Sequence, residues 1–223
     1  MLRQAQARLG RDGRFVYVAA NFYAMPFVEG SFDAAMMVRV MHHVEDVTGL
    51  LCEVARIMAG DGIYVLEFAS KRHLKAILRY ALRQQSWSPF DPSPYEFVEM
   101  NFDFHPDWMR ERLTEAGFHV KHQRSVSHFR LPILKRLIPA RTLATLDGLC
   151  QPTGALWQFT PSVFVQATVS KPARSTPVEN YLCCPVCRLP GLEHGVDALV
   201  CQHCSRHWPF EDGIYDFKSA LPV

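Results

Sequence analysis

Two Cys-x-x-Cys pairs near the carboxy-terminal end constrain the fold of this chain more than any other feature. Cys184 and Cys187 form the first pair, Cys201 and Cys204 form the second, and thirteen residues separate the inner cysteines. Zinc binds four soft ligands as a tetrahedron, and a tight turn brings both sulfurs of one pair to the same ion. Two such turns complete the coordination shell and leave no position for a water or a substrate. The spacing therefore predicts a structural, four-thiolate zinc site in a small domain.

Two further ligand-type side chains lie beside these pairs. Cys183 precedes the first pair and His203 lies within the second. Either one would disturb the regular pairing, so we interpret both as bystanders. The alternative is a disordered tail with four unligated thiols. The duplicated spacing and the aromatic residues that follow it, Trp208 and Phe210, favour the metal site.

Length and composition exclude several classes of protein. With 223 residues, 48% of them hydrophobic, the chain can form one ordinary core and a small second domain. A formal net charge of +2 gives no strong nucleic-acid signal. No apolar run approaches the roughly 18 residues of a membrane helix, and residues 1–10 lack the order of a secretory signal. We therefore expect a cytoplasmic protein without a transmembrane segment, in which thiols stay reduced.

Strand-like and helix-like patterns alternate over the first 70 residues. A helical stretch precedes a β-rich run at 14–20, and residues 31–40 are apolar on both faces, as expected of a central parallel strand. Apolar residues at helical spacing predict a helix over 46–59 that Gly60 and Gly62 end, followed by a strand over 63–68. This alternation predicts a parallel α/β sheet.

The second half continues with helices and strands before a polar segment. We expect a basic amphipathic helix over 71–85, a helix from His105 or Pro106 to Ala116, a strand over 118–128, a helical stretch over 131–148 interrupted at Pro139, and a strand over 162–169. Residues 171–180 are polar, contain proline and are predicted to be a linker. The basic segments 71–83 and 119–146 are compatible with solvent-exposed charge and equally with a lid over an apolar or anionic acceptor.

The cysteine-rich segment has a family resemblance that extends beyond its metal ligands. LCCPVC is followed by LVCQHCSRHWPFEDGIYDF, in which Trp208 and Pro209 precede Asp212, Gly213 and Ile214. Residues 182–217 resemble the small zinc-ribbon proteins that bind and activate tRNA, rRNA and protein methyltransferases. The resemblance implies a stabilising and docking module with a possible protein partner.

The preceding part carries a second set of motifs in a fixed order: MPF at 25–27, GSFD at 30–33, HHV at 42–44, EVAR at 53–56 and GDG at 60–62. As a set they resemble the small-molecule class I S-adenosylmethionine-dependent methyltransferases that include quinone-biosynthesis enzymes. The resemblance covers residues 2–171. It implies an α/β fold, a partial Rossmann-like methyltransferase sheet with helices on both faces, plus the small C-terminal zinc ribbon. The implied domains are 1–170, a linker at 171–180, and the ribbon at 181–223.

This resemblance implies four cofactor-binding residues. Asn21 and Phe22 fall where the family holds the adenine, and Val38 and Arg39 fall at the strand end that lines the methionine part of S-adenosylmethionine. The alternative for Asn21 is a plain turn residue. The histidines at 42–43 fit a general base or a helix-entrance cap, so the catalytic residues stay unassigned.

One departure from the family limits what the chain is expected to do alone. The family's glycine-rich loop after the first strand, and the acidic residue after the second, have no counterpart here. The family's sheet order is 3-2-1-4-5-7-6, so the third strand would lose its neighbour. Either the sequence starts inside a longer protein, which we favour, or the chain is a remnant that does not bind the cofactor.

Two functions follow from these features. The first is methyl transfer from S-adenosylmethionine to an unidentified acceptor, expected to be a small molecule. The alternative is a non-catalytic scaffold whose zinc ribbon docks a partner. Methyl transfer depends mainly on aligning an already reactive sulfonium, so the absence of an obvious nucleophile does not weigh against it.

Overall fold

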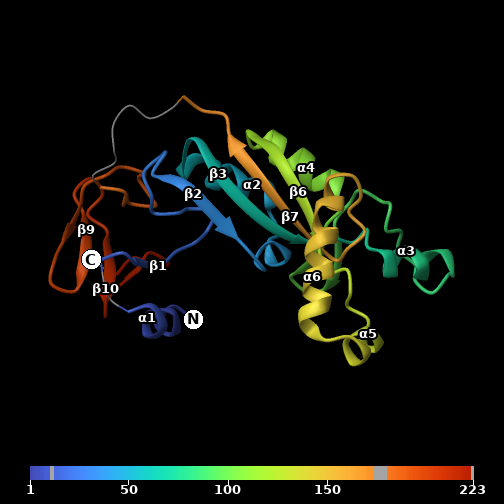
Figure 1. Cartoon of the computed structure of the whole chain (residues 1–223). Helices are drawn as coiled ribbons and strands as arrows, with labels where there is room; N and C mark the ends of the chain where they lie inside the picture. Colours follow the sequence, from blue (N-terminus) through green and yellow to red (C-terminus); the bar gives the residue numbers. More distant parts are fainter. Residues whose placement is uncertain (11–12, 173–179, 222–223) are drawn as a thin grey trace. The chain divides into compact units, whose positions relative to one another are not determined.

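The computed structural model describes residues 1–10, 13–172 and 180–221, and these form two compact units (Figure 1). Unit 1 combines residues 1–31 with 180–221, and unit 2 contains residues 32–172. This division differs from the expected boundaries of 1–170, 171–180 and 181–223, because the first 31 residues belong with the cysteine-rich segment. Most of the expected linker lies outside the described residues.

Unit 2 is built on a four-stranded sheet in the order β2-β3-β7-β6 (Figure 1). Its strands are β2 (Phe32–Met37), β3 (Met58–Ala69), β7 (Ser162–Val169) and β6 (Phe118–Val126). β2 and β3 are parallel, whereas β7 runs antiparallel to both β3 and β6. This is the order 4-5-7-6 of the expected sheet, which confirms the α/β fold class.

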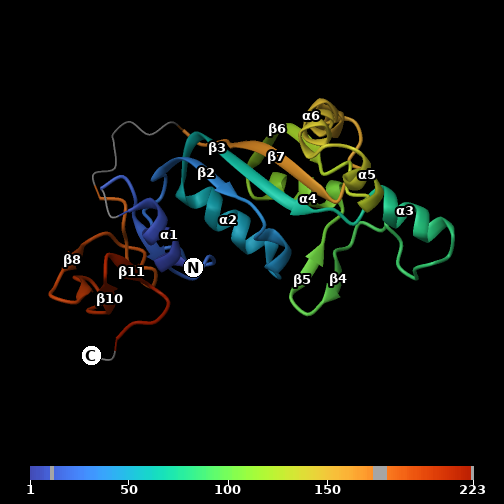
Figure 2. The same ribbon diagram turned by 60° about the horizontal axis from the view of Figure 1, so that its bottom comes forward.

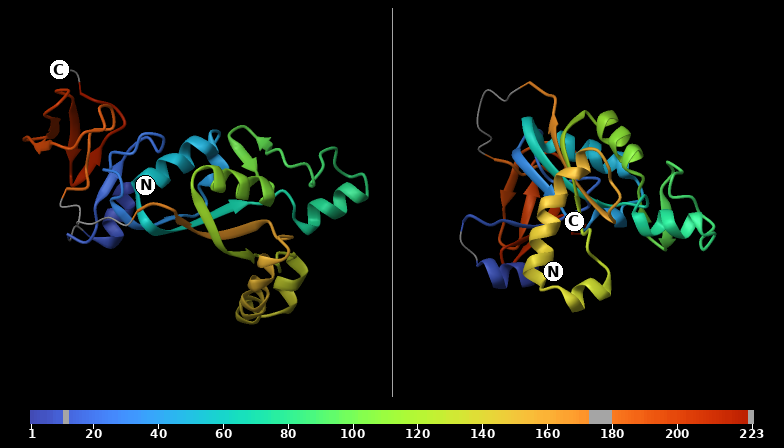
Figure 3. Two further views of the ribbon diagram at one scale, coloured as in Figure 1. Left: turned by 90° about the horizontal axis from the view of Figure 1, so that it is seen from above. Right: turned by 45° about the vertical axis from the view of Figure 1, so that its right-hand side comes forward.

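Helices cover both faces of this sheet, as expected. α2 (Val47–Ile57) and α4 (Pro106–Glu115) lie on one face, whereas α6 (Ala140–Cys150) and the 3₁₀ helix η2 (Gln151–Ala155) lie on the other (Figure 3). Two predicted helix starts are formed by side-chain caps. Asp46 accepts the Gly49 N–H at 2.8 Å, and His105 Nδ1 accepts the Asp107 N–H at 3.2 Å.

The strand predicted to be central lies at an edge of the sheet. β2 has β3 as its one partner in the described structure, and half of its six residues are exposed while none is buried. Met36 is 76% exposed, and Ile63, on the same face of β3, is 43% exposed. The expectation of a strand buried on both faces was wrong, because the described residues do not provide the neighbours that would bury β2.

Gly60 and Gly62 do not end a helix. α2 ends at Ile57, and β3 begins at Met58, so both glycines lie inside the strand. A Cβ atom at Gly60 would lie 2.5 Å from the carbonyl oxygens of Lys171 and Pro172. These glycines are therefore needed where two backbone segments approach closely.

Several connecting elements differ from or refine the predictions. The helix expected over 71–85 is α3 (Leu74–Ala81), and Pro139 separates α5 (Pro132–Leu137) from α6 as expected. The proline-rich stretch after α3 contains an unpredicted hairpin, β4 (Tyr95–Val98) and β5 (Asn101–Asp103) (Figure 2). No described helix is both long and apolar enough to span a membrane.

Unit 1 holds a five-stranded sheet in the order β1-β11-β10-β9-β8. The carboxy-terminal strands are β8 (Leu192–His194), β9 (Ala198–Cys201), β10 (His207–Glu211) and β11 (Ile214–Asp216), and the amino-terminal elements are α1 (Leu2–Leu9) and β1 (Tyr17–Ala19). β1 pairs in parallel with β11, with Tyr17 opposite Ile214. The run at 14–20 was expected to be the third strand of the methyltransferase sheet, without the neighbour that strand 2 would provide. In the described structure its backbone pairs with the edge that β11 offers.

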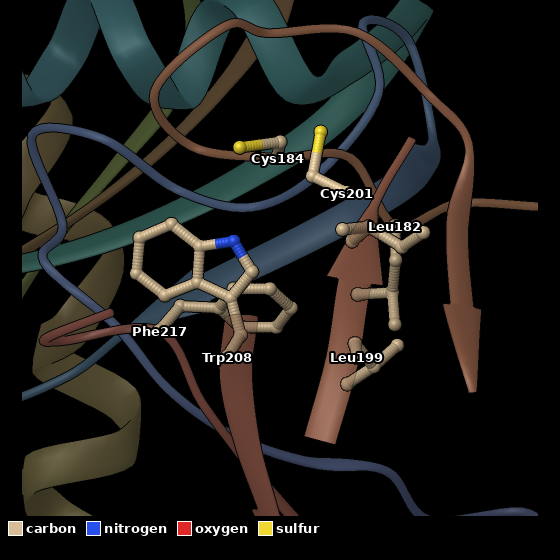
Figure 4. Close-up of a cluster of buried hydrophobic side chains, with 7 residues drawn as sticks. Leu182, Cys184, Leu199, Cys201, Trp208 and Phe217 are labelled. Atoms are coloured by element: carbon tan, nitrogen blue, oxygen red, sulfur yellow. The ribbon is translucent and has the colours of Figure 1, made fainter. Parts of the chain in front are cut away.

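The core of unit 1 is small and includes two of the cysteines. Its seven buried residues are Leu182, Cys184, Leu192, Leu199, Cys201, Trp208 and Phe217. The rings of Trp208 and Phe217 lie side by side below Cys184 and Cys201, with 5.5 Å between their centroids (Figure 4). Partly buried Val18 and Phe27 pack against this cluster, so the amino-terminal segment is part of the same core.

The packing of η2 on β6 can be tested at Gly154. A Cβ atom there would collide with the Ser125 backbone nitrogen and lie 2.6 Å from the Arg124 carbonyl carbon. We expect Gly154→Ala to lower the free energy of unfolding by about 1–3 kcal/mol because the backbone must shift. Gly148→Ala is the control: it meets open space within α6 and should stabilise by about 0.5–1 kcal/mol. Urea unfolding followed by circular dichroism measures both, and equal stabilities would contradict the close contact.

Candidate functional site

The four paired cysteines come together in unit 1. The sulfur atoms of Cys184, Cys187, Cys201 and Cys204 all lie within 4.8 Å of one another. The sulfurs of Cys184 and Cys204 are 3.6 Å apart, and so are those of Cys187 and Cys201. Four soft donors that close together fit the tetrahedral thiolate shell of a zinc ion. Neither Cys183 nor His203 belongs to the group.

The two Cys-x-x-Cys turns have the same backbone geometry. In the first turn the Arg188 N–H donates to the Cys184 carbonyl at 2.9 Å, and in the second the Ser205 N–H donates to the Cys201 carbonyl at 2.9 Å. Arg188 and Ser205 both have positive φ, at 63° and 55°. The first cysteine of each turn also donates its N–H to the residue five positions later. Two turns of equivalent geometry therefore each contribute two sulfurs to the group, as a four-thiolate site requires.

One cysteine of the group has contacts that favour its thiolate. Hydrogen bonds from Arg206, first from its backbone N–H and then from its side chain, lower the pKa of Cys204 to about 6. Since zinc binds the thiolate form, these contacts favour a metal ligand at this position.

A second polar site lies at the carboxyl ends of β2 and β3 in unit 2. The buried Glu67 carboxylate accepts the Arg39 N–H at 2.8 Å and the Ser162 hydroxyl at 2.5 Å. Arg39 has φ 59°, a left-handed conformation that is uncommon outside glycine. Glu67 therefore fixes the backbone where β2 ends, at the edge where open α/β sheets bind ligands.

Two histidines follow directly after this strand end. His42 and His43 lie in the 3₁₀ helix η1 (Met41–His43), with their ring centroids 4.0 Å apart. Burial, and then the neighbouring His43, lower the pKa of His42. His43 Nδ1 lies 3.1 Å from the Met100 carbonyl oxygen. His42 is therefore neutral at neutral pH and able to accept a proton.

The four residues expected to bind the cofactor fall in different units. Val38 and Arg39 lie in unit 2, where both are exposed at the end of β2. Asn21 and Phe22 lie in unit 1, also exposed. The Asn21 side-chain oxygen accepts the Tyr23 N–H at 2.9 Å, which is the geometry of an Asx turn. The cofactor contacts of all four residues stay predictions.

Sequence reasoning missed several polar residues near the end of β3. Glu67 could have been noticed as a single acid in the apolar run IYVLEF. Lys71 is buried and donates to the Ser93 carbonyl at 2.7 Å. Burial raises the pKa of Asp103 to about 6, against the opposing charge of Lys71. Lys71 and Asp103 lie in segments whose sequence gives no sign of burial, so pattern reasoning could not have found them.

Comparisons with known proteins identify the methyltransferase character of the first part. A methyltransferase domain matches residues 1–66. The chain is 32% identical over 127 residues to the demethylmenaquinone methyltransferase of Tropheryma whipplei (strain Twist), over 53% of each protein. It is 28% identical over 131 residues to the ubiquinone/menaquinone biosynthesis C-methyltransferase UbiE of Shewanella sp. (strain ANA-3), over 53% of this chain and 52% of that protein. The chain thus spans about half the length of these relatives.

Two solved structures are also similar. One is the complex of the Haloferax volcanii Trm112 methyltransferase activator with a methyltransferase, at 16% identity and a TM-score of 0.49, over 77% of this chain and 68% of the matched chain. The other is an S-adenosylmethionine-dependent methyltransferase from Mesorhizobium loti, at 17% identity and a TM-score of 0.48, over 75% of each chain.

The polar contacts of Glu67 predict a measurable contribution to stability. Glu67→Ala leaves the Arg39 N–H and the Ser162 hydroxyl without their acceptor, so we expect a loss of about 1–3 kcal/mol. The exposed Glu45→Ala should stay within about 0.5 kcal/mol of the unsubstituted protein. Urea unfolding of both variants measures the difference. A Glu67 variant as stable as the Glu45 variant would show that these contacts do not hold the strand end.

Proposed function

We propose that this protein transfers a methyl group from S-adenosylmethionine to a small-molecule acceptor. The observation that carries the proposal is the match of residues 1–66 to a methyltransferase domain. The 4-5-7-6 order of the unit 2 sheet supports it independently. The names of the two relatives described above, which are quinone-biosynthesis methyltransferases, support a quinone-like small molecule as the acceptor.

In this reaction S-adenosylmethionine supplies an activated methyl group on a sulfonium sulfur. When bound, it would pass this methyl group to the acceptor atom as the sulfur–methyl bond breaks, and the acceptor would release a proton. Neutral His42, beside the end of β2, is the proposed proton acceptor. Glu67 has a positioning role, because it holds the Arg39 backbone that shapes the same strand end.

The open edge of β2 lies where the methyltransferase family has the strand that precedes its glycine-rich loop. In the order 3-2-1-4-5-7-6, strand 1 pairs with strand 4, which corresponds to β2. The β2 edge has no strand partner among the described residues, and Met36 and Ile63 on the adjoining face are exposed. We infer that S-adenosylmethionine binds to a sheet in which another strand, followed by a glycine-rich loop, completes this edge.

We further propose that the four-cysteine group holds a structural zinc ion, so that protein purified without chelators carries one zinc per chain. Cys187→Ser removes a ligand, and we expect loss of zinc together with loss of amide protection in β9, β10 and β11. β1 should lose protection with them because it pairs with β11, whereas β3 and β7 should stay protected. The exposed Cys52→Ser is the control and should keep the metal. Metal analysis and hydrogen exchange measure both effects, and zinc-free protein with a protected β11 would refute the site.

The cofactor proposal predicts a difference between two lengths of chain. Calorimetry should detect weak or no S-adenosylmethionine binding by residues 1–223, and micromolar binding by a chain that also carries an upstream strand and glycine loop. Equal, tight binding by both would show that unit 2 needs no added strand.

Asn21 can be tested within the longer chain. Asn21→Ala should weaken binding by about 1–2 kcal/mol if the amide contacts the adenine. Asn21→Asp is the control, because its carboxylate keeps an acceptor for the Tyr23 N–H and for the adenine amine. If Asn21 is only a turn residue, the Ala variant loses stability, the Asp variant does not, and neither changes affinity.

A further inference from the structure

The basic residues of this chain are concentrated in two segments of unit 2. Residues 71–90 and 116–146 hold 11 of the 24 Lys and Arg residues and none of the 22 Asp and Glu residues. The rest of the chain therefore carries 13 Lys and Arg against all 22 acids. The small formal net charge hides this segregation. A basic region on an otherwise acidic protein directs anionic partners to one surface.

α3, in the first of these segments, has an uncovered apolar stripe. Leu74 and Leu78 in the helix, and Leu82 just after it, recur every four residues and are each more than half exposed. Ala76 is the one buried residue of this helix. In a water-soluble protein, the apolar side of a short helix normally packs on the core. Here the leucine side faces away from the described structure.

A basic stripe runs beside these leucines. Lys75, Arg79 and Arg83 follow them by one residue with the same spacing, and all three are exposed. An apolar stripe bordered by Lys and Arg, without acids, is typical of helices that lie in the plane of a membrane interface.

α5 repeats this combination in the second segment. None of its residues is buried, and Leu131, Ile133 and Leu137 are between 62% and 75% exposed. Lys135 and Arg136 lie between them in the sequence and are also exposed. Two separate elements therefore combine exposed aliphatic side chains with positive charge.

These two elements lie at the same end of unit 2. Burial, and then the positive charges of Lys75 and Arg130, lower the pKa of His73 at the start of α3. Arg130 directly precedes the α5 segment, so that segment lies within electrostatic range of α3. The Leu74 N–H donates to the Phe159 carbonyl at 2.8 Å, which ties α3 to the segment that follows α6. Figure 1 shows α3 and α5 at the same end of the four-stranded sheet, set apart from each other. The two stripes therefore belong to one region of unit 2.

We propose that α3 and α5 form a docking surface for an anionic lipid bilayer, with the leucines inserted among the acyl chains and the Lys and Arg side chains at the headgroups. This goes beyond the proposed methyl transfer and does not depend on it. Anionic headgroups complement two helices that contain no acids, and each basic side chain near such a membrane adds to the attraction. The exposed leucines supply the apolar contact that charge alone lacks.

The exposed leucines favour a lipid bilayer over a nucleic acid as the partner. A nucleic acid would be bound mainly through Lys and Arg contacts to phosphates, and aliphatic side chains on a helix surface would add little. A lipid bilayer uses both kinds of side chain. Substituting the leucines while keeping every charge therefore distinguishes the two partners.

The experiment is co-sedimentation of the full chain with vesicles of phosphatidylcholine alone or mixed equally with phosphatidylglycerol. We expect binding to the mixed vesicles that weakens with added salt, and at least about tenfold weaker binding to phosphatidylcholine. Leu78→Ser with Leu82→Ser, and Arg79→Gln with Arg83→Gln, should each weaken binding on the order of tenfold.

Matched controls come from unit 1. Val196→Ser removes a fully exposed apolar side chain, and Arg8→Gln with Lys218→Gln removes two exposed charges. Both control variants should bind as the unsubstituted chain does, and circular dichroism checks that all variants are folded. Leucine variants that bind normally, equal binding to both vesicle types, or tighter binding to a DNA oligonucleotide at the same salt would each overturn the proposal.

Discussion

The pairing of backbone groups at strand edges is the constraint on which this structure depends. In the hairpin of β10 and β11, one edge of β11 pairs with β10. The other edge would be open, and β1 pairs with it in parallel. The Phe217 N–H donates to the Ala19 carbonyl at 2.7 Å and closes this contact. The ribbon core alone has few buried side chains, and domains of that size need additional stabilisation. The amino-terminal strand contributes apolar side chains to the core, and a zinc ion on the four cysteines would contribute the rest.

In unit 2, Glu67 also holds neighbouring strands together, through hydrogen bonds to its side-chain carboxylate. A buried carboxylate is costly unless its oxygens accept hydrogen bonds, and Glu67 uses one oxygen for the Arg39 N–H and the other for Ser162. Three strands are connected in this way, because Arg39 follows β2, Glu67 lies in β3 and Ser162 begins β7. The strand ends at the proposed cofactor site are thus held by polar contacts. Apolar packing alone would not stabilise the left-handed backbone conformation of Arg39.

Local sequence patterns predicted individual helices and strands better than they predicted which strands pair with each other. The strand over 162–169 and the helix after Asp46 were found because alternation and the helical spacing of apolar residues are local properties. The partner of β1 could not be found, because β-propensity does not identify the edge that a strand will join. Gly60 and Gly62 were misread because glycine is equally typical of a helix end and of close backbone approach. The four cysteines were found because their duplicated spacing encodes a shared ligand, whereas Glu67 is a single residue whose partners are distant in sequence.

The two exposed apolar regions of unit 2 suit different partners because their backbones differ. Beside Met36, the edge of β2 presents N–H and C=O groups that need hydrogen bonds, and these groups cannot be left unpaired in lipid. Another polypeptide strand satisfies them, which favours completion of the sheet at this edge. In α3 and α5 the helices satisfy most of their own backbone groups, and their leucines stand beside Lys and Arg. Contact with a lipid surface requires only side chains there, so the helical region is the one that fits a membrane.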